Sequence, residues 1–185
     1  MRGERSYLGQ ALLITIGGGV VVAVSAVRGI SPGDDLLLRW PAWWQGLAWL
    51  IAWTGWIGAT EVVSIRLGVP SPTRWERQPV GRLVLRTVTI VILAPIAEEL
   101  VFRGLLLQRM ATRLGAAAAV LVTAAAFALL HLRYRAVQTA LIFLDGIVLG
   151  LALVTSQSLV LTMLMHGLGN LFAVWQRLPA YTKRS

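Results

Sequence analysis

The sequence contains no cysteine and little charge, and each absence removes a class of protein. Without cysteine the chain forms no disulfide, no thiol nucleophile and no cysteine-ligated metal site. Only 14% of its 185 residues are charged, against about 25% in soluble globular domains. In contrast, 57% of the residues are hydrophobic. This composition indicates a membrane protein rather than a soluble domain.

Six segments are apolar enough and long enough to cross a bilayer core of about 30 Å as helices. They cover residues 6–27, 40–60, 86–108, 114–132, 136–154 and 158–176. Backbone groups in lipid must be hydrogen-bonded within their own helix, so we expect an all-α fold. The spans leave no room for a separate soluble domain. The sequence therefore predicts one integral-membrane domain over 1–185, a polytopic bundle of about six transmembrane helices.

The first hydrophobic run, 6–27, has a second interpretation as a cleaved signal peptide. It follows the basic residues Arg2 and Arg5, and Val24-Ser25-Ala26 is an acceptable cleavage site. However, its apolar part is longer than the ~7–15 residues of a signal-peptide core. We therefore expect this run to be retained as a transmembrane helix.

The basic residues, which give a formal net charge of +9, are distributed unevenly between the segments that join the spans. Twelve of the 17 lie on one side, in the N-terminal segment, 66–86, 133–135 and the tail from Arg177. Four lie on the opposite side. Positive charge accumulates on the cytoplasmic side, so we expect a multi-pass cell-membrane protein with both termini in the cytoplasm. Binding to anionic lipid headgroups accounts for the basicity, and no nucleic-acid partner is expected.

Two patterns in the apolar segments predict helix packing. Trp49, Trp53 and Trp56 recur at helical spacing, which is typical of a face that packs on other helices or faces lipid. Gly146 and Gly150 are four residues apart, a small-xxx-small pattern that favours a close helix crossing.

Polar or ionisable residues inside the spans are few, and such groups usually mark a functional site because they are costly in lipid. They are Glu98, Glu99, Arg103, His131, Asp145, His166 and Asn170. Glu99 and Arg103 are four residues apart, so they share a helix face and can form an ion pair. Glu98 is turned by about 100° from Glu99 and can therefore face a different neighbour.

Two other helices show the same spacing of functional groups. Phe127 and His131 share one face of the fourth span, and His166 and Asn170 share one face of the sixth. Pro95, one turn before the glutamates, should kink or loosen the third span. Three helices thus offer polar groups on one face, and a bundle could bring them together in one buried pocket.

The motifs in these spans resemble those of a known family. EELVFR at 98–103 matches Glu-Glu-x-x-x-Arg, FALLH at 127–131 matches Phe-x-x-x-His, and HGLGN at 166–170 matches His-x-x-x-Asn. FLDGIVLG at 143–150 is similar to the glycine-rich element found between the last two. In this order, they resemble the CAAX protease and bacteriocin-processing (CPBP) family of intramembrane endopeptidases, which includes the type II CAAX prenyl proteases. The resemblance covers 83–176, the expected catalytic core.

The resemblance implies an endopeptidase that hydrolyses peptide bonds in membrane-associated substrates. Peptide hydrolysis requires a base to activate water and donors for the oxyanion. Glu98 would be the base, His131 would help to hold the same water, and His166 and Asn170 would donate to the oxyanion. The supporting residues would be Glu99, Arg103 and Phe127. The expected partners are the bilayer and a peptide or protein substrate: a prenylated CAAX end, a bacteriocin leader or a membrane-anchored regulator.

Three rival hydrolase mechanisms lack their residues. The two histidines are 35 residues apart, so the chain has no His-Glu-x-x-His motif. An intramembrane aspartyl protease needs two buried aspartates, and only Asp145 lies in a span. A rhomboid-like serine mechanism needs a serine in a suitable Gly-x-Ser-x context, and no serine inside a predicted span has it.

A zinc-dependent mechanism is the alternative to a metal-free one. Glu98, His131 and His166 would supply the two histidines and one carboxylate of a catalytic zinc site, and the resembled family has often been labelled metalloprotease. Zinc-bound imidazoles need acceptors that orient them, and beyond Glu99 and Asp145 the spans offer few charged ones. We therefore expect no required cofactor, with Zn²⁺ as the alternative.

Other functions remain open at this stage. Glu99 and Arg103 could form a purely structural ion pair, and His166 and Asn170 could join helices by hydrogen bonds. Buried ionisable groups, Asp145 among them, also suit a proton-coupled transporter, although no inverted repeat is apparent. A catalytically silent membrane scaffold is a third alternative. The full set of motif residues favours the protease.

Overall fold

The structure is a computed structural model that describes residues 19, 36–132 and 134–178, and these residues are helical and connecting segments without a β-strand. The elements are α2 (Trp43–Arg66), α3 (Val80–Val88), η1 (Thr89–Leu93), α4 (Ala94–Glu99), η2 (Leu100–Leu107), α5 (Gln108–Leu114), α6 (Ala116–Leu129), α7 (Ala136–Ser156) and α8 (Leu159–Arg177). The predicted all-α fold is confirmed. The first predicted span, apart from residue 19, lies outside the described residues.

The predicted spans agree with the helices except at some ends. Of the described helices, α2, α7 and α8 are long and apolar enough to cross a membrane, and α6 is a shorter apolar helix. The third span is longer than predicted at both ends, because helical backbone runs without a break from Val80 to Leu114. The fourth is shorter, because α6 ends at Leu129. The protein is a polytopic helical membrane protein.

The long helix from α3 to α5 is interrupted by two π-helical stretches, η1 and η2. In η1 the hydrogen bonds span five residues, and Ala94 N–H donates to the carbonyl of Thr89. The next donor in that pattern would be Pro95, which has no N–H, so the carbonyl of Ile90 lacks its backbone partner. The predicted loosening at Pro95 is therefore present, as a change of helix type.

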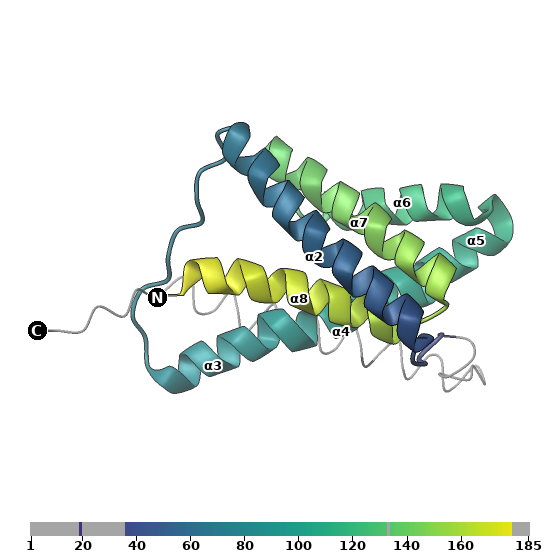
Figure 1. The fold of residues 1–185 in the computed structure, drawn as a ribbon, viewed down its shortest axis with the longest axis horizontal. Helices are drawn as coiled ribbons and strands as arrows, with labels where there is room; N and C mark the ends of the chain where they lie inside the picture. The colour runs from purple at the N-terminus through teal and green to yellow at the C-terminus, as the bar shows by residue number, and fades with distance from the viewer. Residues whose placement is uncertain (1–18, 20–35, 133, 179–185) are drawn as a thin grey trace, which may run out of the picture.

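The helices form a bundle in which α8 lies along the long helix and α2 lies beside α7 (Figure 1). The chain reverses between α5 and α6 at Gly115, whose φ of 79° favours glycine. At the same end of the bundle, Leu159 N–H donates to Leu37 O and the Ser158 hydroxyl donates to Arg39 O. These bonds fix the segment before α2 to the start of α8.

Helices α6 and α7 approach closely, as the two glycines predict. A Cβ atom on Gly146 would lie 3.0 Å from the Cα of Ala124, and one on Gly150 would lie 3.0 Å from a methyl group of Val120. Both distances are shorter than ordinary van der Waals contact. The glycines therefore set the separation of the two helices.

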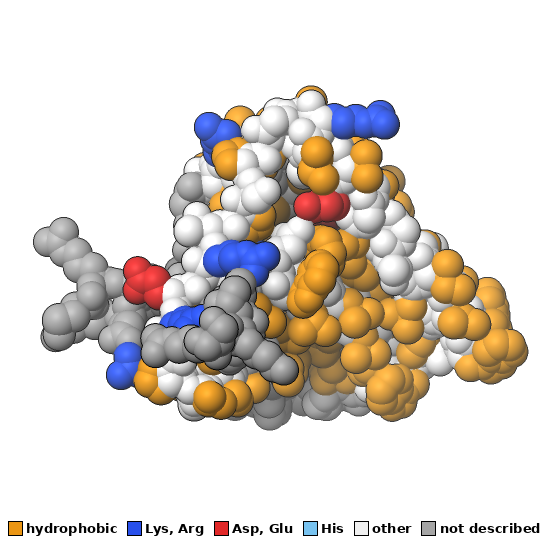
Figure 2. Space-filling view, turned by 60° about the vertical axis from the view of Figure 1, so that its left-hand side comes forward, with side chains coloured by type: hydrophobic (Ala, Val, Ile, Leu, Met, Phe, Trp, Pro, Cys, Tyr) orange, Lys and Arg blue, Asp and Glu red, His pale blue; other side chains and the backbone are white. Residues whose placement is uncertain are grey.

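Three tryptophans of α2 pack on α7 and α8, whereas Trp43 and Trp44, at the start of the helix, are exposed. Trp49 donates its indole N–H to Thr155, at 3.1 Å, and Trp56 donates to Asp145, at 2.7 Å. Trp53 is 3% exposed and lies against Gly169. In Figure 2 hydrophobic side chains cover the lower right of the face, where no charged side chain is seen.

Candidate active site

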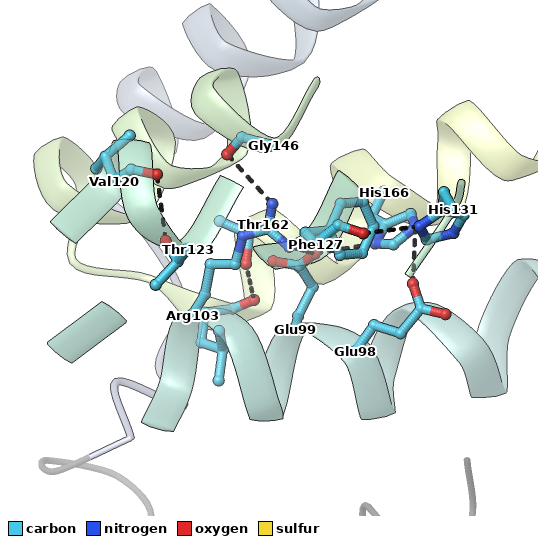
Figure 3. Close-up of polar contacts among 11 residues, drawn as sticks. Glu98, Glu99, Arg103, Val120, Thr123, Phe127, His131, Gly146, Thr162 and His166 are labelled. Atoms are coloured by element: carbon cyan, nitrogen blue, oxygen red, sulfur yellow. Dashed lines mark hydrogen bonds and ion pairs between the residues drawn. The ribbon is translucent and has the colours of Figure 1, made fainter. Parts of the chain in front are cut away.

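Glu99 is the centre of a buried polar cluster (Figure 3). It is the last residue of α4 and is fully buried. Its Oε1 accepts a hydrogen bond from Nη1 of Arg103, at 2.8 Å, which is the predicted ion pair. The same oxygen lies 2.9 Å from Nδ1 of His166 on α8. Glu99 therefore links the long helix to α8. It contacts a positively charged guanidinium and an imidazole, which becomes positive when it is doubly protonated.

Arg103 extends this cluster to a third helix. Its Nη2 donates to the carbonyl of Gly146 on α7, at 3.2 Å. Its guanidinium carbon lies 4.8 Å from the centre of the Phe127 ring of α6, within the range of a cation–π contact. Contacts with a carboxylate, a carbonyl and an aromatic face stabilise a buried arginine that is only 1% exposed.

Glu98 lies on the other side of His166. Its side chain is 25% exposed, and its Oε2 is 3.7 Å from Nε2 of His166. The imidazole thus stands between the two glutamates, with Glu99 at Nδ1 and Glu98 near Nε2 (Figure 3). The adjacent carboxylates thus share His166 as a neighbour, but they differ in burial, and only Glu99 pairs with Arg103.

The contact with Glu99 restricts the protonation of His166. An ionised carboxylate only accepts hydrogen bonds, so Nδ1 of His166 carries the proton that is donated to Oε1. A neutral His166 then has a lone pair on Nε2. For Nε2 to donate to a substrate oxygen, the ring must be the doubly protonated imidazolium.

His131 lies in the turn after α6 rather than on the helix where the spacing predicts it. Its Nδ1 is 2.9 Å from the carbonyl of Phe127. Because a carbonyl only accepts, Nδ1 carries a proton and Nε2 of the neutral ring is an acceptor. His131 therefore still contacts Phe127, four residues earlier, through a hydrogen bond from its side chain to the Phe127 carbonyl.

Phe127 is the wall between the two histidines. It is 4% exposed, and its ring centre lies 4.9 Å from that of His131 and 5.7 Å from that of His166. The contact with His166 is edge-to-face, with an interplanar angle of 86°. Phe127 therefore positions both imidazoles without any polar contact of its own side chain.

Asn170 is held by the carbonyl that Pro95 leaves without a donor. Its Nδ2 donates to the carbonyl of Ile90, at 2.8 Å. Helix α8 can come this close because Gly167 has no side chain: a Cβ there would lie 2.9 Å from the carbonyl oxygen of Val91. The amide of Asn170 is thereby fixed, and the second hydrogen on Nδ2 remains for another acceptor.

A cavity of about 330 Å³ reaches this site from the side of α2 and α7. His131, His166 and Asn170 line it, whereas Glu98 and Glu99 do not. Other parts of its lining come from α2, from residues 69–72 and from the end of α8. A peptide segment in the cavity would thus meet the two histidines and the asparagine.

A zinc site does not fit the placement of these residues. In the described part of the chain, no group of three His, Cys, Asp or Glu residues is placed to hold a metal ion. Both imidazoles nevertheless have an orienting acceptor, because Nδ1 of His166 has Glu99 and Nδ1 of His131 has the uncharged Phe127 carbonyl. The placement of the three side chains, and not a lack of acceptors, disagrees with zinc.

The sequence interpretation missed two sets of contacts. The bond between Glu99 and His166 was not predicted, because the ion pair with Arg103 already accounted for Glu99. The carbonyls of Gly146 and Ile90 have no sequence signal of their own, since every residue carries one. Pro95 was the available signal for Ile90, because a proline removes the donor for a carbonyl earlier in the helix.

The described site can be compared with known proteins. Residues 80–172, half of the chain, match the family described as type II CAAX prenyl endopeptidase Rce1-like. This range includes every polar residue of the site, from Glu98 to Asn170. No curated protein and no solved structure matches the chain. The chain belongs to the Rce1-like family of type II CAAX prenyl endopeptidases, and it is a membrane protease.

Proposed function

We propose that this protein is an intramembrane endopeptidase in which Glu98 activates the attacking water. The observation that carries the proposal is the different surroundings of two adjacent glutamates. Glu99 is fully buried and committed to Arg103 and His166. Glu98 is partly exposed and has no arginine partner among the described residues. A carboxylate that water can reach, beside an imidazole, is suited to take a proton.

The proposed reaction begins with water between Glu98 and the scissile carbonyl. Glu98 takes one proton while the water oxygen bonds to the carbonyl carbon. His131 would hold this water, because its Nε2 is an acceptor. The carbon–nitrogen bond then breaks, and the proton on Glu98 passes to the leaving amine. The products are a carboxylic acid and an amine, and Glu98 returns to its ionised form.

Two donors would stabilise the oxyanion that forms when water attacks. One is the second hydrogen on Nδ2 of Asn170, whose amide the Ile90 carbonyl holds in place. The other is Nε2–H of the imidazolium form of His166, which Glu99 supports at Nδ1. Donors that are fixed before the reaction stabilise developing charge without having to reorganise. On this proposal Glu99 and Arg103 act by positioning, and no metal takes part.

The substrates we propose are peptide segments at the membrane, among them prenylated CAAX ends, bacteriocin leaders and membrane-anchored regulators. We place the basic segments in the cytoplasm, so substrate would enter from that leaflet. The lining of the cavity supports this route, because residues 69–72 and Arg177 belong to the basic side. A reporter fused to the C-terminus tests the orientation; activity of that reporter only outside the cell would contradict it.

The decisive experiment is cleavage of a panel of such peptides by the purified chain in detergent. We expect cleavage of at least one class, with Glu98→Gln inactive on the same peptide. The same preparations in liposomes test the transporter alternative. Proton-coupled uptake without cleavage of any peptide would replace the protease proposal, and binding without either activity would favour the scaffold.

A further inference from the structure

Asp145 is a carboxylate in the cavity that the proposed reaction does not use. It lies on α7, next to Gly146, whose carbonyl contacts Arg103. It lines the same cavity as His166 and Asn170. Its Oδ1 accepts a hydrogen bond of 2.7 Å from the indole N–H of Trp56. A neutral donor on a different helix thus fixes the direction of this side chain.

The second oxygen of Asp145 has no hydrogen-bond partner among the described residues. Among the described residues, Oδ2 makes no hydrogen bond and Asp145 has no ion pair. It is also not one of the polar atoms that protein encloses without a partner. One oxygen is therefore held by Trp56, and the other is open to whatever occupies the cavity.

The cations near Asp145 are already bound elsewhere. Arg103 contacts Glu99 and a carbonyl, and His166 stands between the two glutamates. Arg177, on the cavity lining, donates to the carbonyl of Ala173 at 2.6 Å. Removing a carboxylate from water is costly unless a positive charge or donors compensate it. A single indole N–H provides only part of that compensation.

The wall around Asp145 is suited to a long aliphatic stem that ends in a charge. Apolar side chains of α2 and α7 line the same cavity, beside polar ones such as Thr60 and Gln138; the apolar ones are Trp53, Ile57, Leu141, Ile142 and Leu149. A lysine or arginine side chain places its methylene groups against apolar surface and its charged end on an acceptor. Arrangement and charge thus favour a cationic group over a neutral one.

We propose that Asp145, oriented by Trp56, binds a positively charged group of the substrate, a lysine or arginine side chain or a free amine. The subsite shares the cavity with His166 and Asn170, so the cationic residue would lie near the bond that is cut. This inference rests on the proposed function and adds a substrate preference to it. The step is one of binding, and Asp145 is a specificity residue rather than a catalytic one.

Binding to an inactive chain tests the subsite separately from turnover. The probes are fluorescein-labelled, lipid-anchored peptides in which one position at a time is either lysine or norleucine, in an uncharged detergent. Fluorescence anisotropy measures their affinity for the Glu98→Gln variant. We expect lysine at one position, or at two neighbouring ones, to bind about tenfold more tightly than norleucine, as for a hydrogen bond to a charged group.

Two double variants then test whether the tighter binding of lysine peptides depends on Asp145. In Glu98→Gln/Asp145→Asn, where an amide oxygen can still accept from Trp56, we expect the lysine-to-norleucine ratio to fall to about one. In Glu98→Gln/Glu61→Gln, which removes another carboxylate from the cavity lining, the ratio should persist. No lysine gain at any position, or a gain that survives Asp145→Asn, would overturn the inference.

Cleavage by the unmodified chain separates this inference from the proposed function. A lysine-dependent affinity that needs Asp145, without cleavage of any peptide, would support the subsite and contradict the protease proposal. Cleavage with equal affinity for lysine and norleucine peptides would support the protease and contradict the subsite. Trp56→Phe should weaken the lysine gain while leaving the carboxylate in place, because the side chain loses its fixed direction.

Discussion

The groups on the two sides of His166 differ in their burial and in how many hydrogen-bond partners they have. On the Glu99 side, which we call the closed side, a carboxylate, a guanidinium, an imidazole and a backbone carbonyl bind one another in a buried set. Within this set, Oε2 of Glu99 and Nε of Arg103 have no hydrogen-bond partner. On the Glu98 side, which we call the open side, three groups can still bond to a water or a substrate. They are the partly exposed carboxylate of Glu98, Nε2 of His131 and one hydrogen on Nδ2 of Asn170. A glutamate occurs on each side. Its partners and its burial, rather than its residue type, therefore distinguish a supporting residue from a reacting one.

The largest expected effect is on turnover when the open side loses its carboxylate. Glu98→Gln keeps the shape and the hydrogen-bonding capacity but cannot take a proton. We expect kcat to fall by about 10²–10⁴-fold, the usual contribution of a positioned base, with little change in thermal unfolding. Glu61→Gln is the matched control on the cavity lining and should retain turnover. An active Glu98→Gln enzyme would end the assignment of the base.

The closed side should respond in stability. Glu99→Gln leaves the buried Arg103 without its counter-charge, which costs about 3–5 kcal/mol for a broken buried pair. Thermal unfolding in detergent measures this loss. Glu99→Gln/Arg103→Met, which removes both charges, should recover much of it, because an apolar replacement leaves no unpaired charge. Equal losses of stability in Glu98→Gln and Glu99→Gln would remove the distinction between the two sides.

A smaller effect on stability is expected from a substitution of Gly146, whose carbonyl on α7 contacts Arg103. Gly146→Ala places a methyl group 3.0 Å from Ala124, so α6 and α7 must separate. We expect a loss of about 1–3 kcal/mol, as for overpacked cores, measured by thermal unfolding. Gly58→Ala on α2 is the control, because a Cβ there meets no atom within 4 Å. If both variants unfold alike, the close crossing does not hold the closed side together.

The smallest expected effect is that of metal removal. Because the described residues offer no group of three ligands, protein treated with a strong chelator and assayed in metal-free buffer should keep its turnover. The measurement is the cleavage rate before and after stripping. Loss of turnover that stoichiometric zinc restores would make His131 and His166 ligands, and the open side would then be a metal site.

The sequence predicts the fold and the helix faces better than it predicts the contacts between them. Hydrophobic runs predict α7 and α8 to within two residues, because length and apolarity decide whether a helix spans lipid. They also predict α2, although this helix continues six residues beyond the predicted end at residue 60. The spacing of Glu99 and Arg103 predicts their ion pair, because both lie on one helix. Contacts within one element follow from its periodicity alone.

Contacts between elements depend on tertiary placement, which one-dimensional spacing does not contain. His131 lies beyond the end of α6, although its spacing from Phe127 is helical. Helix ends depend on local capping and on the turn that follows, and these are the least predictable parts of a helix. The bond from Glu99 to His166 joins residues that are 67 positions apart, and it depends on how α8 packs against α4.

The contacts of Arg103 and Glu99 also bear on how the chain enters a membrane during synthesis. Within their own helix these two residues have only each other, and a charged residue at the centre of a membrane helix costs about 2.5–3.5 kcal/mol on insertion scales. The Gly146 carbonyl and the His166 imidazole, which are their further hydrogen-bond partners, belong to helices that the ribosome makes later. The charged pair of the long helix from Val80 to Leu114 therefore depends on hydrogen bonds from helices that are made after it. A chain truncated before α8 would leave Glu99 in the bilayer without its bond to His166.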